Sequence, residues 1–138
     1  MAEIEQADWT RQQAIIASIR RQVFIEEQSV PEELEWDGLD ADAVHLLARV
    51  NGQAVGTARM LADGHIGRMS VLKAFRGQGI GRQLINRLLE LAAEHGLQAV
   101  NLDAQTHALG FYERQGFIAE GEVFMDAGIP HRHMRKRL

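Results

Sequence analysis

The sequence contains no cysteine, which excludes disulfide bonds, thiolate metal ligands and a cysteine nucleophile. Its formal net charge is −4, so it lacks the basic field that would favour nucleic-acid binding. No apolar run approaches the roughly 18 residues of a membrane span. The first eight residues carry Glu3, Glu5 and Asp8 without the basic segment of a signal peptide. We therefore expect a soluble cytoplasmic protein without nucleic-acid or membrane partners.

The composition is that of one globular domain. The chain has 138 residues, of which 46% are hydrophobic and 25% are charged. This length and this mixture suit a single core, so we expect one domain over residues 1–138.

The hydrophobic spacing predicts a mixed α/β protein. Helical spacing predicts helices over residues 10–28, 79–95 and 106–115. Alternating or apolar stretches predict strands over residues 44–50, 53–61, 65–72, 98–103, 117–125 and 132–138. The first three strands form an antiparallel meander, with a type I′ turn at Asn51-Gly52. The unit at 65–103 is β-α-β, so its two strands must run parallel.

Local details of these elements follow from the same patterns. In the first helix, Ile15, Ile19, Val23 and Phe24 share an apolar face and Arg20 lies elsewhere, with Thr10 as N-cap. Thr106 is expected to cap the third helix in the same way. Residues 127–130 are expected to form the turn before the last strand.

Residues 29–42 form an acidic loop between the first helix and the first strand. A loop of this length in a small domain is often functional, for example as a lid. Its acidic side chains are either solvated or attract a cationic amine to a nearby site. These side chains are Glu32, Glu33, Glu35, Asp37, Asp40 and Asp42.

A glycine-rich segment precedes the helix at 79–95. Gly77, Gly79 and Gly81 fall within five residues, so backbone amides there can approach an anion without obstruction by Cβ atoms. The free N–H groups at the start of the helix point at the same place. A phosphate or pyrophosphate suits this arrangement, and a glycine turn with only a structural role is the alternative.

Two nucleotide-binding motifs fit this segment less well. A Walker loop ends in Gly-Lys-Ser/Thr, whereas this segment continues as Gly81-Arg82-Gln83. A dinucleotide fingerprint has the spacing GxGxxG, whereas residues 77–81 have GxGxG. Asp103 stands about twenty residues further on, where such a fingerprint has an acidic residue, so that interpretation stays open.

The segment Arg76-Gly77-Gln78-Gly79-Ile80-Gly81 resembles the Arg/Gln-x-x-Gly-x-Gly/Ala signature of the GNAT acetyltransferase superfamily. The resemblance continues through residues 68–71 before it and through Phe111-Tyr112-Glu113-Arg114-Gln115-Gly116-Phe117 after it. Residues 23–28 and 127–131 are similar to the ElaA-like bacterial subgroup. The resemblance implies a mixed, mostly antiparallel central sheet flanked by helices. It further implies that two splayed parallel strands form a coenzyme A cleft.

The resemblance also implies roles for individual residues. Amides of residues 77–81 would hold the pyrophosphate of acetyl-CoA, and the backbone amide of Val71 would stabilise the oxyanion. Tyr112, the one tyrosine of the sequence, would be the general acid. Gln105 stands where the family often has a cofactor-binding asparagine. The cofactor-binding residues implied are Met69, Val71, Arg76, Gly77, Gln78, Gly79, Ile80, Gly81, Arg82 and Gln105.

The resemblance does not assign the general base to one residue. Glu27 is the candidate that we favour, and Glu26, His65, His107 or a water relay are alternatives. His131 matches the subgroup and would line the acceptor site or serve a structural role. The six histidines show no HExxH spacing, so we expect no metal.

The expected activity is acetyl transfer from acetyl-CoA to a primary amine of a small molecule, peptide or protein. A homodimer is implied by the same resemblance. A non-catalytic acyl-CoA-binding or sensor domain on the same fold is the principal alternative. A nucleotide-binding module that uses the same loop is the second.

Overall fold

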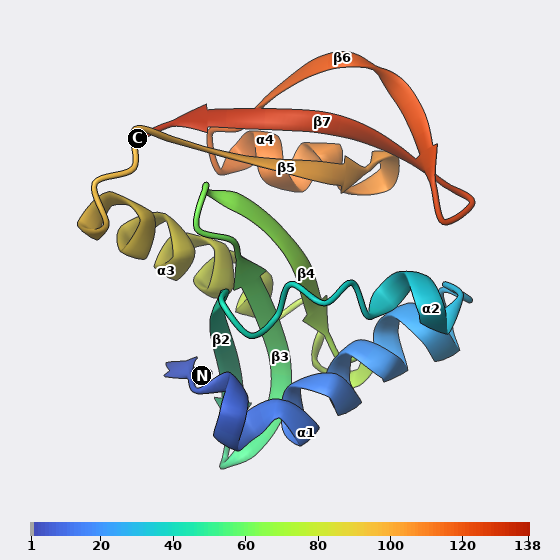
Figure 1. The fold of residues 1–138 in the computed structure, drawn as a ribbon, viewed down its shortest axis with the longest axis vertical. Helices are drawn as coiled ribbons and strands as arrows, with labels where there is room; N and C mark the ends of the chain where they lie inside the picture. The colour runs from blue at the N-terminus through green and yellow to red at the C-terminus, as the bar shows by residue number, and fades with distance from the viewer. Residues whose placement is uncertain (1) are drawn as a thin grey trace.

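The computed structural model describes residues 2–138 and arranges them around one seven-stranded sheet (Figure 1). The sheet order is β1-β2-β3-β4-β5-β7-β6. β4 and β5 run parallel, and the other neighbours in this order run antiparallel. The strands are β1 (Glu3–Ala7), β2 (Val44–Val50), β3 (Gln53–Met60), β4 (His65–Val71), β5 (Ala99–Gln105), β6 (Ile118–Asp126) and β7 (Ile129–Arg137). The mixed α/β fold expected from the sequence is confirmed.

Helices cover both faces of this sheet. They are α1 (Trp9–Arg20), its π-helical continuation η1 (Arg21–Glu27), α2 (Glu32–Glu35), the 3₁₀ turn η2 (Lys73–Phe75), α3 (Ile80–Glu94), the 3₁₀ turn η3 (Thr106–Ala108) and α4 (Leu109–Arg114). Neighbouring residues of β2 show how the layers divide. Leu46 packs in the large core with α3, whereas Leu47 packs against α1 through Ile16 and Ile19. Because side chains alternate along a strand, α1 and α3 lie on opposite faces.

The parallel strands separate soon after they meet. β4 and β5 pair at His65 with Asn101 and at Ile66 with Leu102, near the start of β4 (Figure 1). Beyond that point β4 has a bulge, because its register against β3 shifts between Thr57 and Arg59. Arg68 within the bulge has φ of 52°, a left-handed conformation that non-glycine residues rarely adopt. A bulge bends its strand, so β4 turns away from β5.

Several local predictions are wrong. Asp8 caps α1 by accepting a hydrogen bond from the Thr10 amide, so Thr10 is not the N-cap. Ile15 is 38% exposed, whereas Arg20 is fully buried. Thr106 makes no capping hydrogen bond, since no side chain caps η3 or α4.

Other differences concern where elements begin and end. β1 was not expected, because a short acidic edge strand has too few apolar residues to show a pattern. Residues 32–35 of the expected loop form α2. The last turn is shorter than expected, since β6 ends at Asp126 and β7 begins at Ile129. The type I′ turn is confirmed, since Asn51 and Gly52 both have positive φ, 50° and 83°.

The acidic loop is held to the sheet by buried ion pairs. Glu35 and Asp40 are only 2% and 7% exposed, so they are neither solvated nor free to attract a substrate amine. Arg20 Nε lies 2.6 Å from Glu35 Oε2, and its Nη1 lies 2.7 Å from Asp40 Oδ1. The whole network joins Arg20, Arg59 and Arg68 to Glu35, Asp37 and Asp40. Removing one member leaves a buried charge without its partner, so we expect each to matter for stability.

Asp37 provides a test of this network through pH. Burial opposes its ionisation, but hydrogen bonds from Arg59 and from the Leu39 amide outweigh it and lower the pKa from 3.8 to about 2. The unfolded chain therefore binds a proton first as the pH falls. The contribution of Asp37 to stability is present above about pH 4 and is lost toward pH 2.

We predict that Asp37→Asn lowers the free energy of unfolding by about 1 kcal/mol at pH 7, since solvent screens part of its interaction with the arginines, and by much less near pH 2. Urea denaturation at the two pH values measures this difference. Asp42→Asn is the control, since Asp42 lies in the same segment but outside the network that joins Asp37 to Arg59 and Arg68. An equal loss at both pH values would show that Asp37 does not act through its charge.

Candidate functional site

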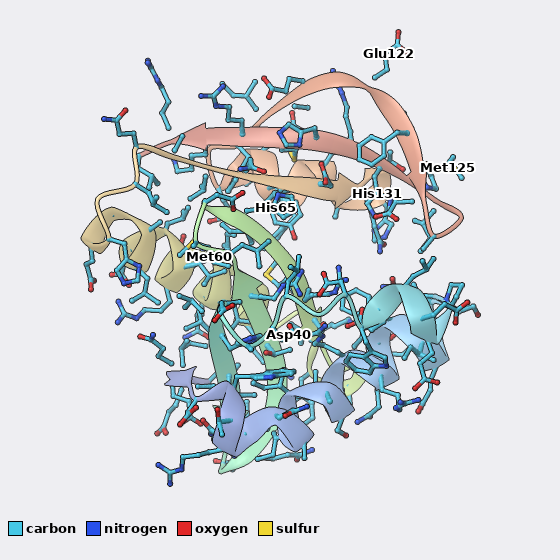
Figure 2. The ribbon with its side chains drawn as sticks, in the orientation of Figure 1. Asp40, Met60, His65, Glu122, Met125 and His131 are labelled. Atoms are coloured by element: carbon cyan, nitrogen blue, oxygen red, sulfur yellow. The ribbon has the colours of Figure 1, made fainter. Side chains whose placement is uncertain are left out.

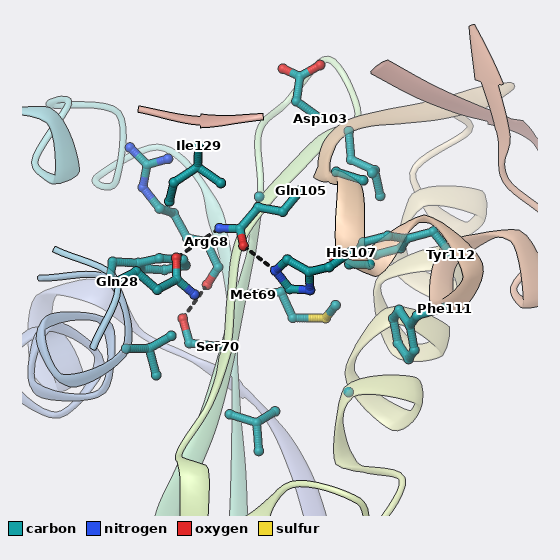
Figure 3. A pocket seen from close by; sticks show the side chains of 18 of the residues that line it. Gln28, Arg68, Met69, Ser70, Asp103, Gln105, His107, Phe111, Tyr112 and Ile129 are labelled. Carbon is teal, nitrogen blue, oxygen red and sulfur yellow. Dashed lines mark hydrogen bonds between the residues drawn. The ribbon is translucent and has the colours of Figure 1, made fainter. Parts of the chain in front are cut away.

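The separation of β4 from β5 opens a cleft of about 910 Å³ (Figure 3). Its walls come from η1, β4, the glycine-rich loop, the start of α3, the end of β5, α4 and the β6–β7 turn. Figure 3 shows Gln28 and Arg68 on one side of the cleft, with Tyr112 and Phe111 on the other. The catalytic and cofactor-binding residues predicted from the sequence line this cleft except Gln78, and of the alternative bases His65 and His107 line it whereas Glu26 does not.

The glycine-rich loop presents bare backbone to the cleft. Gly77 and Gly79 have φ of 80° and 81°, and no atom lies within 4 Å of where a Cβ atom would stand on either. Gly79 is the N-cap of α3 and offers no side chain to its first amides. The next glycine, Gly81, packs against the ring of Phe111, 3.4 Å from its would-be Cβ. The open amides and the positive end of the helix dipole form a site for an anion.

The open edge of β4 carries a free amide at Val71. The Leu72 amide donates to Val55 on β3, 2.8 Å away, which makes Val71 and Gly56 a non-hydrogen-bonded pair. In such a pair the N–H and C=O groups point away from the partner strand. The Val71 backbone therefore faces the cleft. Its carbonyl accepts a hydrogen bond from Arg76 Nε at 2.9 Å, and its N–H points the same way.

Arg76 joins this strand edge to the end of η1. Its guanidinium forms a two-pronged ion pair with Glu27, with N–O distances of 2.6 and 2.7 Å. The hydrogen bonds from Arg76 lower the pKa of the Glu27 carboxyl. A carboxylate held in this way is a poorer base, so the geometry favours a clamp over the general-base role expected for Glu27.

A chain of amide and imidazole groups crosses the cleft at the end of β5. Gln105 Nε2 donates to Gln28 Oε1 at 2.8 Å, and Gln105 Oε1 lies 2.7 Å from His107 Nε2 (Figure 3). Gln28, the C-cap of η1, was not among the predicted site residues. It lies more than seventy positions from Gln105 in the sequence, so no local pattern could reveal this contact.

Tyr112 is half-buried between two aromatic rings. Its ring meets Phe111 and Phe117 edge-on, with centroid distances of 5.0 and 5.9 Å. Burial raises the pKa of its phenol to about 12. The phenol therefore keeps its proton throughout the neutral range and is available as a donor.

The remaining side of the cleft is formed by the β6–β7 turn and the segment after η1. Phe24, Val30 and Leu34 contribute apolar groups, and Ile129 and His131 face them from β7. Arg68 also lines this side; the sequence motif indicated its strand, but not its left-handed backbone. Within residues 2–138, no three His, Asp or Glu side chains are placed to hold a metal ion. None of the helices described there is long and apolar enough to cross a membrane.

Known proteins match this chain over nearly its full length. ElaA of Escherichia coli strain K12 is 35% identical over 131 residues, which cover 89% of this chain and 86% of ElaA. The crystal structure of an acyl-CoA N-acyltransferase from Pseudomonas aeruginosa has a TM-score of 0.87 at 35% identity and covers 99% of both chains. A GNAT acetyltransferase from Elizabethkingia anophelis with acetyl-CoA bound shares the fold, with a TM-score of 0.75 at 18% identity and coverage of 99% and 98%.

The match to a family model agrees with these relatives and with the cleft. The model for the acetyltransferase (GNAT) domain matches residues 5–138. The chain therefore belongs to the GNAT acetyltransferase family, with ElaA among its relatives.

Proposed function

We propose that this protein is an N-acetyltransferase that moves the acetyl group of acetyl-CoA to a primary amine of a small molecule, peptide or protein. The observation that carries the proposal is that the free Val71 amide and the uncapped start of α3 face one cleft. An anion site alone fits many ligands. An anion site beside a strand edge with a free N–H fits a phosphorylated thioester whose carbonyl must be polarised.

The residues present fit acetyl-CoA. The space where Gly77 and Gly79 would carry Cβ atoms is empty of protein, so pyrophosphate oxygens can reach the amides of residues 77–81. Met69 and Val71 on the open edge of β4 would pair with the pantetheine arm. Arg82 lines the cleft and adds positive charge, and Gln105 offers a polar contact. Arg76 would act mainly by holding Val71 and Glu27 in place.

The chemistry divides between the substrate and the protein. Acetyl-CoA supplies a thioester, at which the amine displaces the thiol without a covalent enzyme intermediate. The Val71 N–H stabilises the negative charge that develops on the carbonyl oxygen. Tyr112 donates its proton to the departing sulfur. The amine must also lose a proton, and Glu27 is poorly suited to accept it because of its ion pair with Arg76. The homodimer and the cytoplasmic location stay predictions.

We predict that the protein releases coenzyme A when it is mixed with acetyl-CoA and a panel of primary amines, and that at least one amine becomes acetylated. A thiol reagent measures the release and mass spectrometry identifies the product. Acetyl-CoA binding with no turnover on any amine would favour the non-catalytic acyl-CoA-binding domain instead.

A second prediction concerns the glycine-rich loop. Acetyl-CoA at about 100 times its Kd should stabilise the protein by about 2.7 kcal/mol, which raises Tm by roughly 8 °C, whereas ATP and NAD should have little effect. Gly79→Ala should remove most of this shift. Gly96→Ala is the matched control, because Gly96 follows the other end of α3 and also has positive φ, 78°. A larger shift with ATP or NAD than with acetyl-CoA would overturn the cofactor proposal.

A third prediction tests the general acid. Tyr112→Phe keeps the aromatic contacts with Phe111 and Phe117 but has no proton to donate. We expect kcat to fall by about 100-fold, with the KM for acetyl-CoA nearly unchanged. Steady-state kinetics with an amine from the panel measure both. Unchanged turnover would remove Tyr112 from the acid role.

A further inference from the structure

His131 faces the cleft from the opposite side of the sheet to Tyr112. It pairs with Gln105 on β5, and antiparallel partners point to the same face. Gln105 reaches Gln28 at the end of η1, whereas its neighbour Ala104 packs into the core with α3. His131 therefore lies on the face covered by α1 and η1, near the β6–β7 turn (Figure 2). Tyr112 approaches from α4, on the other face.

The ring of His131 is held in one tautomer by its own backbone. Its Nδ1 lies 2.7 Å from the carbonyl oxygen of Ile129. A carbonyl oxygen can only accept a hydrogen bond, so Nδ1 must carry the proton. In the neutral ring, Nε2 then has a free lone pair.

The residues around His131 restrict the movement of its imidazole ring. Pro130 stands between donor and acceptor, and its ring fixes φ of that residue. Proline also restricts Ile129 before it to extended backbone. The imidazole stacks on Phe124 of β6, with centroids 5.9 Å apart and planes 24° apart. His131 is only 9% exposed, so its orientation is set by the protein.

The other candidate bases have different partners. Glu27 is paired with Arg76, and Glu35 is paired with Arg20 and Arg68. His65 lies where β4 and β5 are still paired, at the closed end of the cleft.

The amide oxygen of Gln105 accepts from His107 Nε2, so that nitrogen carries a proton. Among these groups, His131 combines a fixed tautomer with a position at the open end of the cleft.

We propose that His131 is the general base of this enzyme, acting through Nε2 on the acceptor amine. This inference rests on the proposed acetyl transfer. Nε2 takes a proton from the ammonium form of the acceptor, and the neutral amine then attacks the thioester. As the new C–N bond forms, the nitrogen loses its second proton to solvent. As the C–S bond breaks, Tyr112 gives its proton to sulfur. Solvent then takes the proton from the imidazolium and returns one to the phenolate, so charge and atoms balance.

The test compares two amines that differ in basicity but little in shape. Benzylamine is protonated near neutral pH, whereas the nitrogen of O-benzylhydroxylamine is not. We expect His131→Gln to lower kcat/KM for benzylamine by about 100-fold and for O-benzylhydroxylamine by less than about threefold. His133→Gln is the matched control, because His133 lies two residues further along β7 and pairs with Asp103. It should leave both rates unchanged.

The outcomes separate this inference from the proposed function. An equal loss with both amines would mean that His131 has a structural role. This result would overturn the proposal that His131 is the general base, and it would leave the proposed acetyl transfer unaffected. If the wild-type protein acetylates no amine at all, the proposed function is wrong, and so is the general-base role of His131. The tautomer is tested without turnover. Long-range ¹⁵N–¹H correlation spectra of the full chain, assigned with His131→Gln, should show the Nδ1–H form. The Nε2–H form would overturn the proposal.

Discussion

The site depends on the parting of β4 and β5 after two residue pairs. Strands that stay paired satisfy each other's backbone groups, and strands that separate leave them exposed. Here the bulge at Arg68 turns β4 away, and the left-handed backbone of that residue costs on the order of 1 kcal/mol or more. The guanidinium of Arg68 offsets this cost, since it pairs with Glu35 and Asp37. The bulge and the acidic loop are thus parts of one arrangement.

The same network explains why the loop between α1 and β2 is ordered. Three arginines face three carboxylates, so the cluster is electrically balanced without a ligand. A buried ion pair adds little net stability compared with apolar residues of similar size. Removing only one partner is strongly destabilising, however, because it leaves the other charge buried and unpaired. The main effect of the network is to fix the position of the loop. It holds Leu34 and Glu35 against the cleft, on the side where η1 ends.

The sequence predicted what depends on local patterns and missed what depends on distant partners. The glycine spacing and the apolar face of residues 79–95 predict α3 and the anion site, because both depend on residues that are close together in the sequence. The burial of Arg20 could not be predicted, since its partners Glu35 and Asp40 lie 15 and 20 residues away. The ion pair of Glu27 with Arg76 spans 49 residues, so no local pattern could show that a guanidinium holds this carboxylate.

The alternation of side chains along β5 places the proposed acid and the proposed base on opposite faces of the sheet. Ala104 points to the core beside α4, and the next residue, Gln105, points to η1 and lies opposite His131. If Tyr112 gives a proton to the sulfur and His131 takes one from the amine, the two side chains act from opposite faces of the sheet. Solvent, rather than direct proton transfer between them, would then restore their protonation states.

This arrangement also indicates which part of the cleft would select the acceptor amine. If acetyl-CoA enters along the glycine-rich loop beside α3 and α4, the acceptor must enter beside η1 and the β6–β7 turn. The residues there include the apolar Phe24, Val30, Leu34 and Ile129 and the polar or charged Gln28, Arg68 and Asp126. The acceptor would then be selected by irregular segments that no sequence period describes, whereas the cofactor would be held by the glycine-rich start of α3.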